Sequence, residues 1–285
     1  MKSVSKATGT MSVCLSDICL CFGLKRDAYY KSRHRFQKKN EVASKVIKLV
    51  EQERKDLPRV GTRKLYEALQ PFFDAEQLKV GRDCLFDILR ANNMLVKRKK
   101  VSCRTTNSYH RFYKYKNLVK DIQVVKPNQV WVSDITYIRT VKGFCYLALV
   151  TDMYSRKIVG YDISDTLELA GCQRAFELAR RQARPAAGLI HHSDRGSQYC
   201  SNEYVKKLKK HKVKISMTEE NHCYENAIAE RVNGILKDEF YLDQCFFSTD
   251  HACVAAKNAI KIYNNKRLHL SLDYKTPNMV FENVA

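Results

Sequence analysis

The sequence predicts an α/β protein in which small all-α units precede a mixed β-sheet covered by helices. From about residue 127 the apolar residues change from helical to strand-like spacing, in the order βββ-α-β-α-β-α. Before that point the spacing is helical and the charge is strongly basic. The order of elements therefore separates an N-terminal helical half from an α/β core.

The first helical unit, residues 1–55, contains a possible helix–turn–helix motif. Val13, Ile18 and Leu20 precede Gly23, which suits a tight turn, and a second helix would begin near Arg26. Ordinary helical hairpins have the same pattern, so both interpretations stay open.

A second helical unit, expected to bind DNA, spans residues 56–96. Pro58 and Gly61 mark its start. Basic residues lie along it, among them Arg63 and Lys64. Its two helices are indicated by apolar residues at helical spacing: Leu65 and Leu69, then Leu85, Ile88 and Leu89.

A basic linker follows over residues 97–126. It begins with four consecutive cations, Lys97, Arg98, Lys99 and Lys100. Aromatic residues follow at 109, 112, 113 and 115. Cations interleaved with aromatics suit a segment that follows a nucleic-acid backbone, but the aromatics could equally pack on the next domain.

Charge and composition narrow the function. The 285 residues have a net charge of +21, of which residues 1–126 contribute +17 and residues 127–285 only +4. This concentration indicates a partner that is a polyanion, and we expect double-stranded DNA. No apolar run is long enough for a membrane span, and we identify no signal peptide. The eleven scattered cysteines include no CxxC pair, which favours reduced thiols in the cytoplasm over zinc or disulfides.

The core is expected over residues 127–240, with a helical tail over 241–285. Residues 141–143 supply the turn between the first two strands. The expected strands are 130–138, 146–151, 157–163, 189–192 and 213–217, and the expected helices are 167–184, 203–211 and 226–240.

Two aspartates in the core are candidate functional residues. Asp134 lies inside the first strand on the same face as Val130 and Val132, where a charge is disfavoured. Asp194 follows strand 189–192 directly, and strand ends in α/β sheets are places where ligands bind. Each could instead be structural, as a hydrogen-bonded buried residue or as a turn or helix cap.

Glu230 lies on the last core helix. We expect the apolar side of this helix to pack on the sheet, and Glu230 and Lys237 to project from the other face. Charges on a helix more often simply face solvent. At about 100° per residue, one arc holds Asn226, Glu230, Asn233 and Lys237, and the opposite side holds Ile228, Val232, Ile235 and Leu236.

Together, the three carboxylates make chemical sense as ligands of Mg²⁺, which prefers oxygen donors and keeps coordination positions for phosphate. Two such ions support in-line displacement at a phosphodiester, and Mn²⁺ can substitute. His191 and His192 point to opposite faces of their strand, so we expect them to support the site and not to bind metal.

The motifs resemble those of the OrfB transposases of the bacterial insertion-sequence-three family, within the DDE transposase and retroviral integrase superfamily. Asp194 and Glu230 are separated by 35 residues, the spacing of that superfamily. The resemblance rests on residues 61–65, 131–137, 151–156, 192–199, 225–230, 263–269 and 276–277.

The resemblance implies an RNase H-like catalytic core in which Asp134, Asp194 and Glu230 hold the metals and Lys237 contacts DNA. It implies cleavage that exposes a 3′-hydroxyl, followed by attack of that hydroxyl on a second phosphodiester. It also implies a homo-oligomer on DNA and an OrfA partner or fusion. Two alternatives remain: a non-catalytic DNA-binding regulator derived from a transposase, and an RNase H-type hydrolase.

Overall fold

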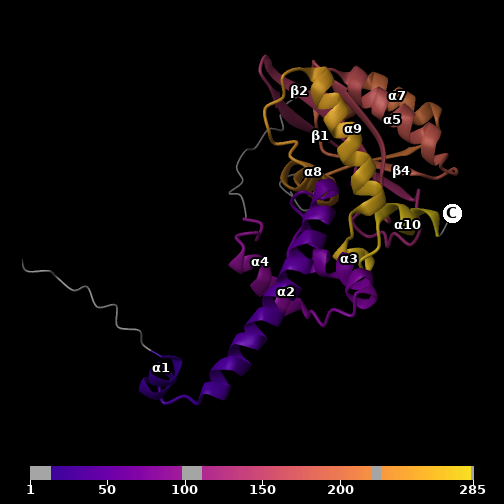
Figure 1. Ribbon diagram of the computed structural model, residues 1–285. Helices are drawn as coiled ribbons and strands as arrows, with labels where there is room; N and C mark the ends of the chain where they lie inside the picture. Colours follow the sequence, from indigo (N-terminus) through magenta and orange to yellow (C-terminus); the bar gives the residue numbers. More distant parts are fainter. Residues whose placement is uncertain (1–13, 98–110, 220–225, 284–285) are drawn as a thin grey trace, which may run out of the picture.

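The computed structural model describes residues 14–97, 111–219 and 226–283, which form an α/β body and an attached helical unit (Figure 1). Four helices make up the helical unit. From the body, α2 projects outward and carries α1 at its tip (Figure 1). The bounds are α1 (Leu15–Cys21), α2 (Arg26–Asp56), α3 (Thr62–Ala75) and α4 (Arg82–Ala91).

The turn between α1 and α2 follows the predicted pattern. Gly23 has a φ of +65°, a left-handed conformation that favours glycine, and α2 begins at Arg26. The expected unit boundary after residue 55 falls inside α2. The reason is that Val46 and Val50 are buried with Leu65 and Leu85, so the last turns of α2 belong to the core that α3 and α4 build.

The body contains a five-stranded mixed sheet in the order β3-β2-β1-β4-β5. β1, β2 and β3 are antiparallel neighbours, whereas β4 and β5 run parallel to β1. The strands are β1 (Val130–Thr140), β2 (Gly143–Asp152), β3 (Ile158–Ser164), β4 (Ile190–Ser193) and β5 (Lys214–Met217). All five strands match the predicted ones within a few residues.

Helices cover both faces of the sheet, because alternate residues of the strands are apolar on both sides. On one face, Ala148 and Val150 pack with α5 (Leu169–Ala183) and α7 (Asn202–Lys210). On the other, Leu147 and Leu149 pack with α8 (Ala227–Glu239) and α9 (Thr249–Lys266). A further short helix, α6 (Ser197–Cys200), follows β4 and is not indicated by the sequence pattern.

The described part of the linker lies against the sheet edge. Leu118 donates its backbone N–H to Ser216 Oγ at 2.8 Å, beside β5. Of the linker aromatics, Tyr115 is partly buried against the core, as expected for packing on the next domain, while Tyr113 is exposed. Tyr109 and the cations 98–100 lie outside the described residues.

The tail after α9 contains a short 3-10 helix (Leu270–Leu272) and α10 (Pro277–Glu282). Within the described segments every cysteine is free, and none of the helices there has the length and hydropathy that crossing a membrane requires.

Candidate active site

The two aspartates lie side by side at neighbouring strands. β1 and β4 are parallel, and Ser133 pairs with Ser193. Asp134 and Asp194 are each the next residue along the chain. Strand pairing therefore brings together two carboxylates that are 60 positions apart in the sequence numbering.

Asp134 is half-buried and accepts two hydrogen bonds. Its Oδ1 accepts from the backbone N–H of Ile135 at 2.9 Å, and its Oδ2 accepts from Asn233 Nδ2 at 2.8 Å. Burial, together with the charges of Asp194 and Glu230, raises the pKa of Asp134 to about 7, although the hydrogen bonds from Asn233 and Ile135 lower it. A nearby cation would relieve this cost.

Asp194 begins the loop between β4 and α6. Its Oδ1 accepts from the backbone N–H of Gly196 at 3.1 Å. A Cβ atom at Gly196 would lie 3.1 Å from the same oxygen, tighter than an ordinary contact. A glycine at this position therefore leaves the carboxylate room to turn.

Helix α8 carries Glu230 and packs its apolar residues as expected. Val232, Ile235 and Leu236 are buried in the cluster that includes the sheet residue Ile138. Glu230 is exposed, one turn before Asn233.

The polar arc of α8 does not all project away from the sheet, because its two asparagines face inward. Asn226 and Asn233 are buried, and both face β1. Asn226 Nδ2 donates to the Ser133 carbonyl at 3.3 Å, and Asn233 Nδ2 donates to Asp134. Buried amides need partners, and the carbonyl and carboxylate of β1 supply them. The arc therefore docks α8 beside Asp134.

The donor set fits a hard divalent cation. Three carboxylates act on one another electrostatically, as the raised pKa of Asp134 shows. Among the described residues, no three His, Cys, Asp or Glu side chains are already gathered around one point. Asp134 and Asp194 are thus the pair that the fold brings together. Glu230 lies on the solvent side of α8, the helix whose Asn233 contacts Asp134.

Lys237 lies two turns after Glu230 on α8 and is half-buried. Burial lowers its pKa, while the Asp134 carboxylate acts in the opposite direction. The basic residue expected beside the carboxylates is therefore within their electrostatic reach.

The two histidines of β4 support the strands, as expected. His191 Nε2 lies 2.8 Å from Ser133 Oγ and 3.0 Å from Tyr204 Oη, whereas His192 Nδ1 lies 2.9 Å from Ser216 Oγ. Burial lowers the pKa of His191 to about 3, so this ring is neutral.

An ion-pair cluster holds the C-terminal end of α8. Glu239 accepts from Lys64 Nζ at 3.1 Å and from Arg267 at 2.6 and 2.8 Å. Arg267 is only 2% exposed. Although burial opposes ionisation, the hydrogen bonds and charges of Arg267 and Lys64 lower the pKa of Glu239. Lys64, expected to contact DNA, thus lies against an acidic partner from the core.

The other basic residues expected to contact DNA lie in the helical unit and the linker. Arg63 and Lys97 are exposed. Arg98, Lys99 and Lys100 lie outside the described residues. Nearby, Arg59 stacks 4.2 Å from the centre of the Tyr241 ring and donates to the Asp238 carbonyl at 3.2 Å. Together with Lys64, Arg59 joins the helical unit to the end of α8.

Sequence reasoning missed two functional contacts, Asn233 with Asp134 and Lys64 with Glu239. The regular spacing of the polar residues at 226, 230, 233 and 237 on α8 is a sequence signal for the contact of Asn233 with Asp134. Asp152, in the 151–156 motif, is fully buried and is structural: it accepts from Ser155 N at 2.8 Å and from Asn128 N at 2.7 Å.

Comparison with known proteins identifies the family of this chain. Two family models, each described as "Integrase core domain", match residues 124–223 and 211–277. The chain is 36% identical over 266 residues to "Insertion element IS600 uncharacterized 31 kDa protein" of Shigella sonnei, covering 91% of this chain and 96% of that protein. It is 31% identical over 219 residues to "Transposase for insertion sequence element IS629" of Shigella sonnei, covering 76% and 72%.

Among solved structures, the chain resembles the HTLV-2 integrase catalytic core domain in complex with magnesium (trimeric form). The identity is 20%, the TM-score is 0.46, and the match covers 56% of this chain and 99% of that one. The integrase-core matches, together with the mixed five-stranded sheet and its helices, confirm the RNase H-like fold.

Proposed function

Because the chain belongs to the DDE transposases of the bacterial insertion-sequence-three family, we propose that it cleaves and joins DNA at the ends of its own element in a Mg²⁺-dependent reaction. The observation that carries this proposal is the pairing of Ser133 with Ser193, which sets Asp134 beside Asp194.

Asp134, Asp194 and Glu230 are the residues that would hold the metal, most simply as two ions. When bound, Mg²⁺ or Mn²⁺ supplies activation of a hydroxyl nucleophile and stabilisation of the leaving oxygen. The protein would expose a 3′-hydroxyl at the element end, and that hydroxyl would attack a second phosphodiester, with no covalent bond between protein and DNA.

The chain's own residues prepare this site. Asn233 holds one oxygen of Asp134 and thereby fixes the rotation of α8, on which Glu230 sits one turn away. Ile135 N–H holds the other oxygen. Lys237 would contact the DNA beside the carboxylates, since it lies on the same helix and within the field of Asp134.

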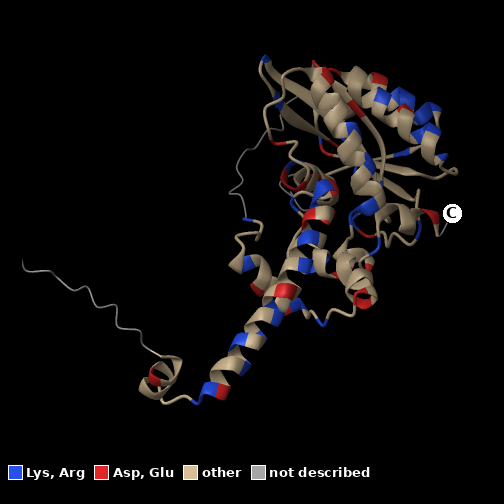
Figure 2. Ribbon diagram, in the orientation of Figure 1, with Lys and Arg blue, Asp and Glu red and all other residues tan. Residues whose placement is uncertain are grey.

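The helical unit would bind DNA along its basic surfaces. In Figure 2 the blue of Lys and Arg positions recurs along the whole length of the α2 ribbon. The first half of this helix is exposed throughout, as is Arg63 on α3. We assign DNA contacts to Arg63, Lys97 and the cations at 98–100, and we assign Lys64 to holding Glu239. Binding of this kind would weaken steeply with salt.

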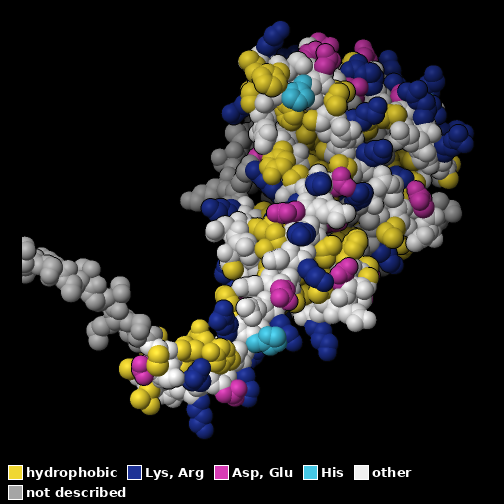
Figure 3. All heavy atoms as spheres, viewed as in Figure 1, with side chains coloured by type: hydrophobic (Ala, Val, Ile, Leu, Met, Phe, Trp, Pro, Cys, Tyr) yellow, Lys and Arg dark blue, Asp and Glu magenta, His cyan; other side chains and the backbone are white. Residues whose placement is uncertain are grey.

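The active form would be an oligomer on DNA that holds two element ends, in the bacterial cytoplasm and on the nucleoid. Figure 3 shows apolar side chains gathered on α1 and the start of α2, at the outer end of the projecting helix. Exposed members include Leu20, Phe22 and Leu24. An OrfA partner or fusion remains part of this proposal.

The test is incubation of the purified protein with a labelled fragment of its own element's terminus, with Mg²⁺ or with EDTA. We expect metal-dependent nicking or end joining, lost in Asp194→Asn. An RNA–DNA hybrid serves as the second substrate. Cleavage of the hybrid alone would favour an RNase H-type hydrolase, and tight DNA binding without chemistry, even after OrfA is added, would favour a regulator.

A further inference from the structure

Two of the motifs in the sequence hold no carboxylate of the site, yet they meet in space. These are the 151–156 turn and the tail that begins at 263. The Asn264 side chain makes hydrogen bonds of 2.9 Å to both the N–H and the carbonyl of Ile158. Tyr263 Oη donates to the Arg156 carbonyl at 2.9 Å. The tail therefore fixes the turn that follows β2.

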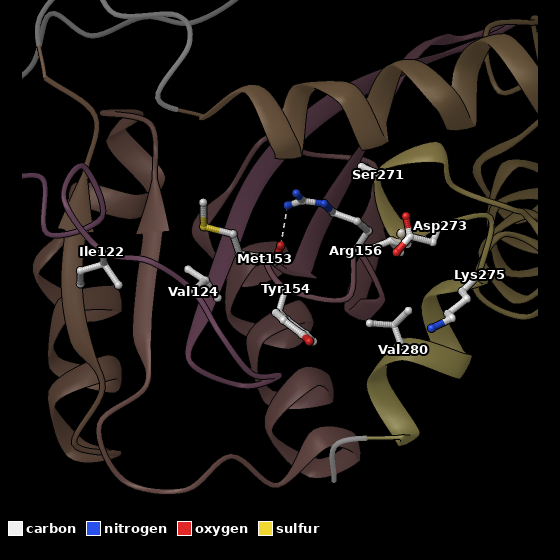
Figure 4. A pocket seen from close by; sticks show the side chains of 10 residues that line it. Ile122, Val124, Met153, Tyr154, Arg156, Ser271, Asp273, Lys275 and Val280 are labelled. Carbon is white, nitrogen blue, oxygen red and sulfur yellow. Dashed lines mark hydrogen bonds between the residues drawn. The ribbon is translucent and has the colours of Figure 1, made fainter.

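A pocket of about 440 Å³ lies between the turn, the tail and the linker. In Figure 4, Met153, Tyr154 and Arg156 rise from the turn, while Lys275 and Val280 come from the tail. The linker supplies Ile122 and Val124. The volume of the pocket is within the range of sites that hold small ligands.

The lining combines an apolar wall, one aromatic ring, the two cations Arg156 and Lys275, and the carboxylate of Asp273. Arg156 has a φ of +64°, an uncommon conformation for a residue other than glycine. Its guanidinium is half-buried and donates to the Met153 carbonyl (Figure 4), and burial lowers its pKa. Within the described part of the chain, neither Arg156 nor Lys275 forms an ion pair. Asp152 acts on Arg156 electrostatically but forms no ion pair with it, so the half-buried guanidinium can still bind an anionic ligand.

The pocket lies near the start of β1, the strand that carries Asp134. Met153 N–H donates to the Val130 carbonyl at 2.9 Å, and Val130 is four residues before Asp134 on β1, about 13 Å along the strand. Met153, Ile122 and Val124 also pack in the cluster that contains Ala229, next to Glu230. A DNA strand held at the carboxylates could reach the pocket within a few nucleotides.

We propose that this pocket takes one nucleotide of the DNA near the cleavage site, with its base out of the stack. The base would lie against Tyr154 and the apolar wall, and its phosphate would be bound by Arg156 and Lys275. This inference rests on the proposed function, because DNA is the ligand it requires.

The test uses element-end duplexes with 2-aminopurine at each position around the terminus in turn, since this base fluoresces more strongly when it is unstacked. Full-length protein is added in EDTA, so that no chemistry occurs. We expect a several-fold rise at one position, lost in Tyr154→Ala and strongly reduced in Lys275→Gln. Arg139→Gln, an exposed arginine toward the other end of β1, is the matched control and should keep the signal.

DNA binding by fluorescence anisotropy and thermal unfolding are measured for every variant. Lys275 is exposed, so its substitution should leave folding intact even if Tyr154→Ala does not. The proposal is overturned if no position brightens while the duplex is bound, or if the signal survives both substitutions. A parallel reaction with Mg²⁺ measures nicking: nicking there without any brightening in EDTA would leave the proposed function standing, whereas absence of DNA binding would contradict the proposed function itself.

Discussion

Asn233 Nδ2 donates a hydrogen bond to Asp134 Oδ2 at 2.8 Å, so the helix that carries Glu230 is tied directly to the strand that carries the first aspartate. The bond is a buried one to a carboxylate, the class that contributes most among hydrogen bonds.

Replacing Asn233 with leucine should slow end cleavage while leaving DNA affinity unchanged. The amide lowers the pKa of Asp134, so its loss should raise that pKa and move the acid limb of the rate–pH profile to higher pH. Loss of one charge-assisted bond corresponds to about a tenfold or greater decrease in rate. Asn258→Leu, at an exposed position of α9, is the control. An unshifted acid limb in Asn233→Leu would contradict this role.

Asp134 should make the metal-free protein less stable as the pH rises. Its folded pKa of about 7 lies above the ordinary 3.8, so its contribution is complete below pH 3.8 and is lost as pH rises to about 7. In EDTA at pH 8, Asp134→Asn should therefore exceed the wild type in free energy of unfolding by on the order of 2 kcal/mol, after solvent screening.

Thermal unfolding in EDTA across this pH range measures the effect. Mg²⁺ should raise the Tm of the wild type at pH 8 and not that of Asp134→Asn. Equal pH dependence of the two proteins would show that Asp134 titrates normally.

His191 should make the fold sensitive to acid. Its folded pKa of about 3 lies below the ordinary 6.5, so its contribution is complete above pH 6.5 and is lost as the pH falls toward 3. Between pH 6.5 and 5 the wild type should lose about 2 kcal/mol more than His191→Gln. Chemical denaturation at several pH values tests this, with His34→Gln at an exposed position as the control.

Glu239 should be essential for joining the helical unit to the core. Glu239→Gln leaves Lys64 facing the buried Arg267, which should cost about 3–5 kcal/mol of the free energy of unfolding. Adding Lys64→Met should restore part of that loss, because one of the two facing cations is removed. Denaturant unfolding of both single variants and the double variant measures the coupling. Purely additive effects would rule out the interaction.

The adjacent basic residues Arg63 and Lys64 should differ in DNA binding. Arg63 is exposed, so Arg63→Gln should lower the slope of log affinity against log salt by about 0.9 for a lost phosphate contact. Lys64→Gln should change the slope little, because Lys64 is paired with Glu239. Neutralising residues 97–100 should flatten the slope further. Equal slopes for Arg63→Gln and Lys64→Gln would contradict the assignment.

Much of the core was accessible from the sequence because its strands are continuous apolar runs bounded by turn residues. Residues 146–151, expected as a buried strand, lie inside β2. A charge inside such a run, as at Asp134, is visible for the same reason.

The partners of polar residues were not accessible, because spacing gives the relative positions of residues on a helix but not the direction in which its faces point. The spacing placed Asn233 on the same face of the helix as Glu230, although Asn233 is buried and Glu230 is exposed. Lys64 and Glu239 are 175 residues apart, and a local pattern cannot distinguish an exposed lysine from one paired at such a distance.

The most direct test of the central claim is Mn²⁺ binding to the full-length protein on its element-end DNA, measured by electron paramagnetic resonance together with end cleavage. The proteins compared are the wild type, Asp134→Asn, Asp194→Asn, Glu230→Gln and the exposed-surface control Glu203→Gln. We expect each of the three site variants to lose tight Mn²⁺ binding and cleavage while retaining its fold and its affinity for DNA. A Glu230→Gln protein that binds Mn²⁺ and cleaves DNA like the wild type would contradict it.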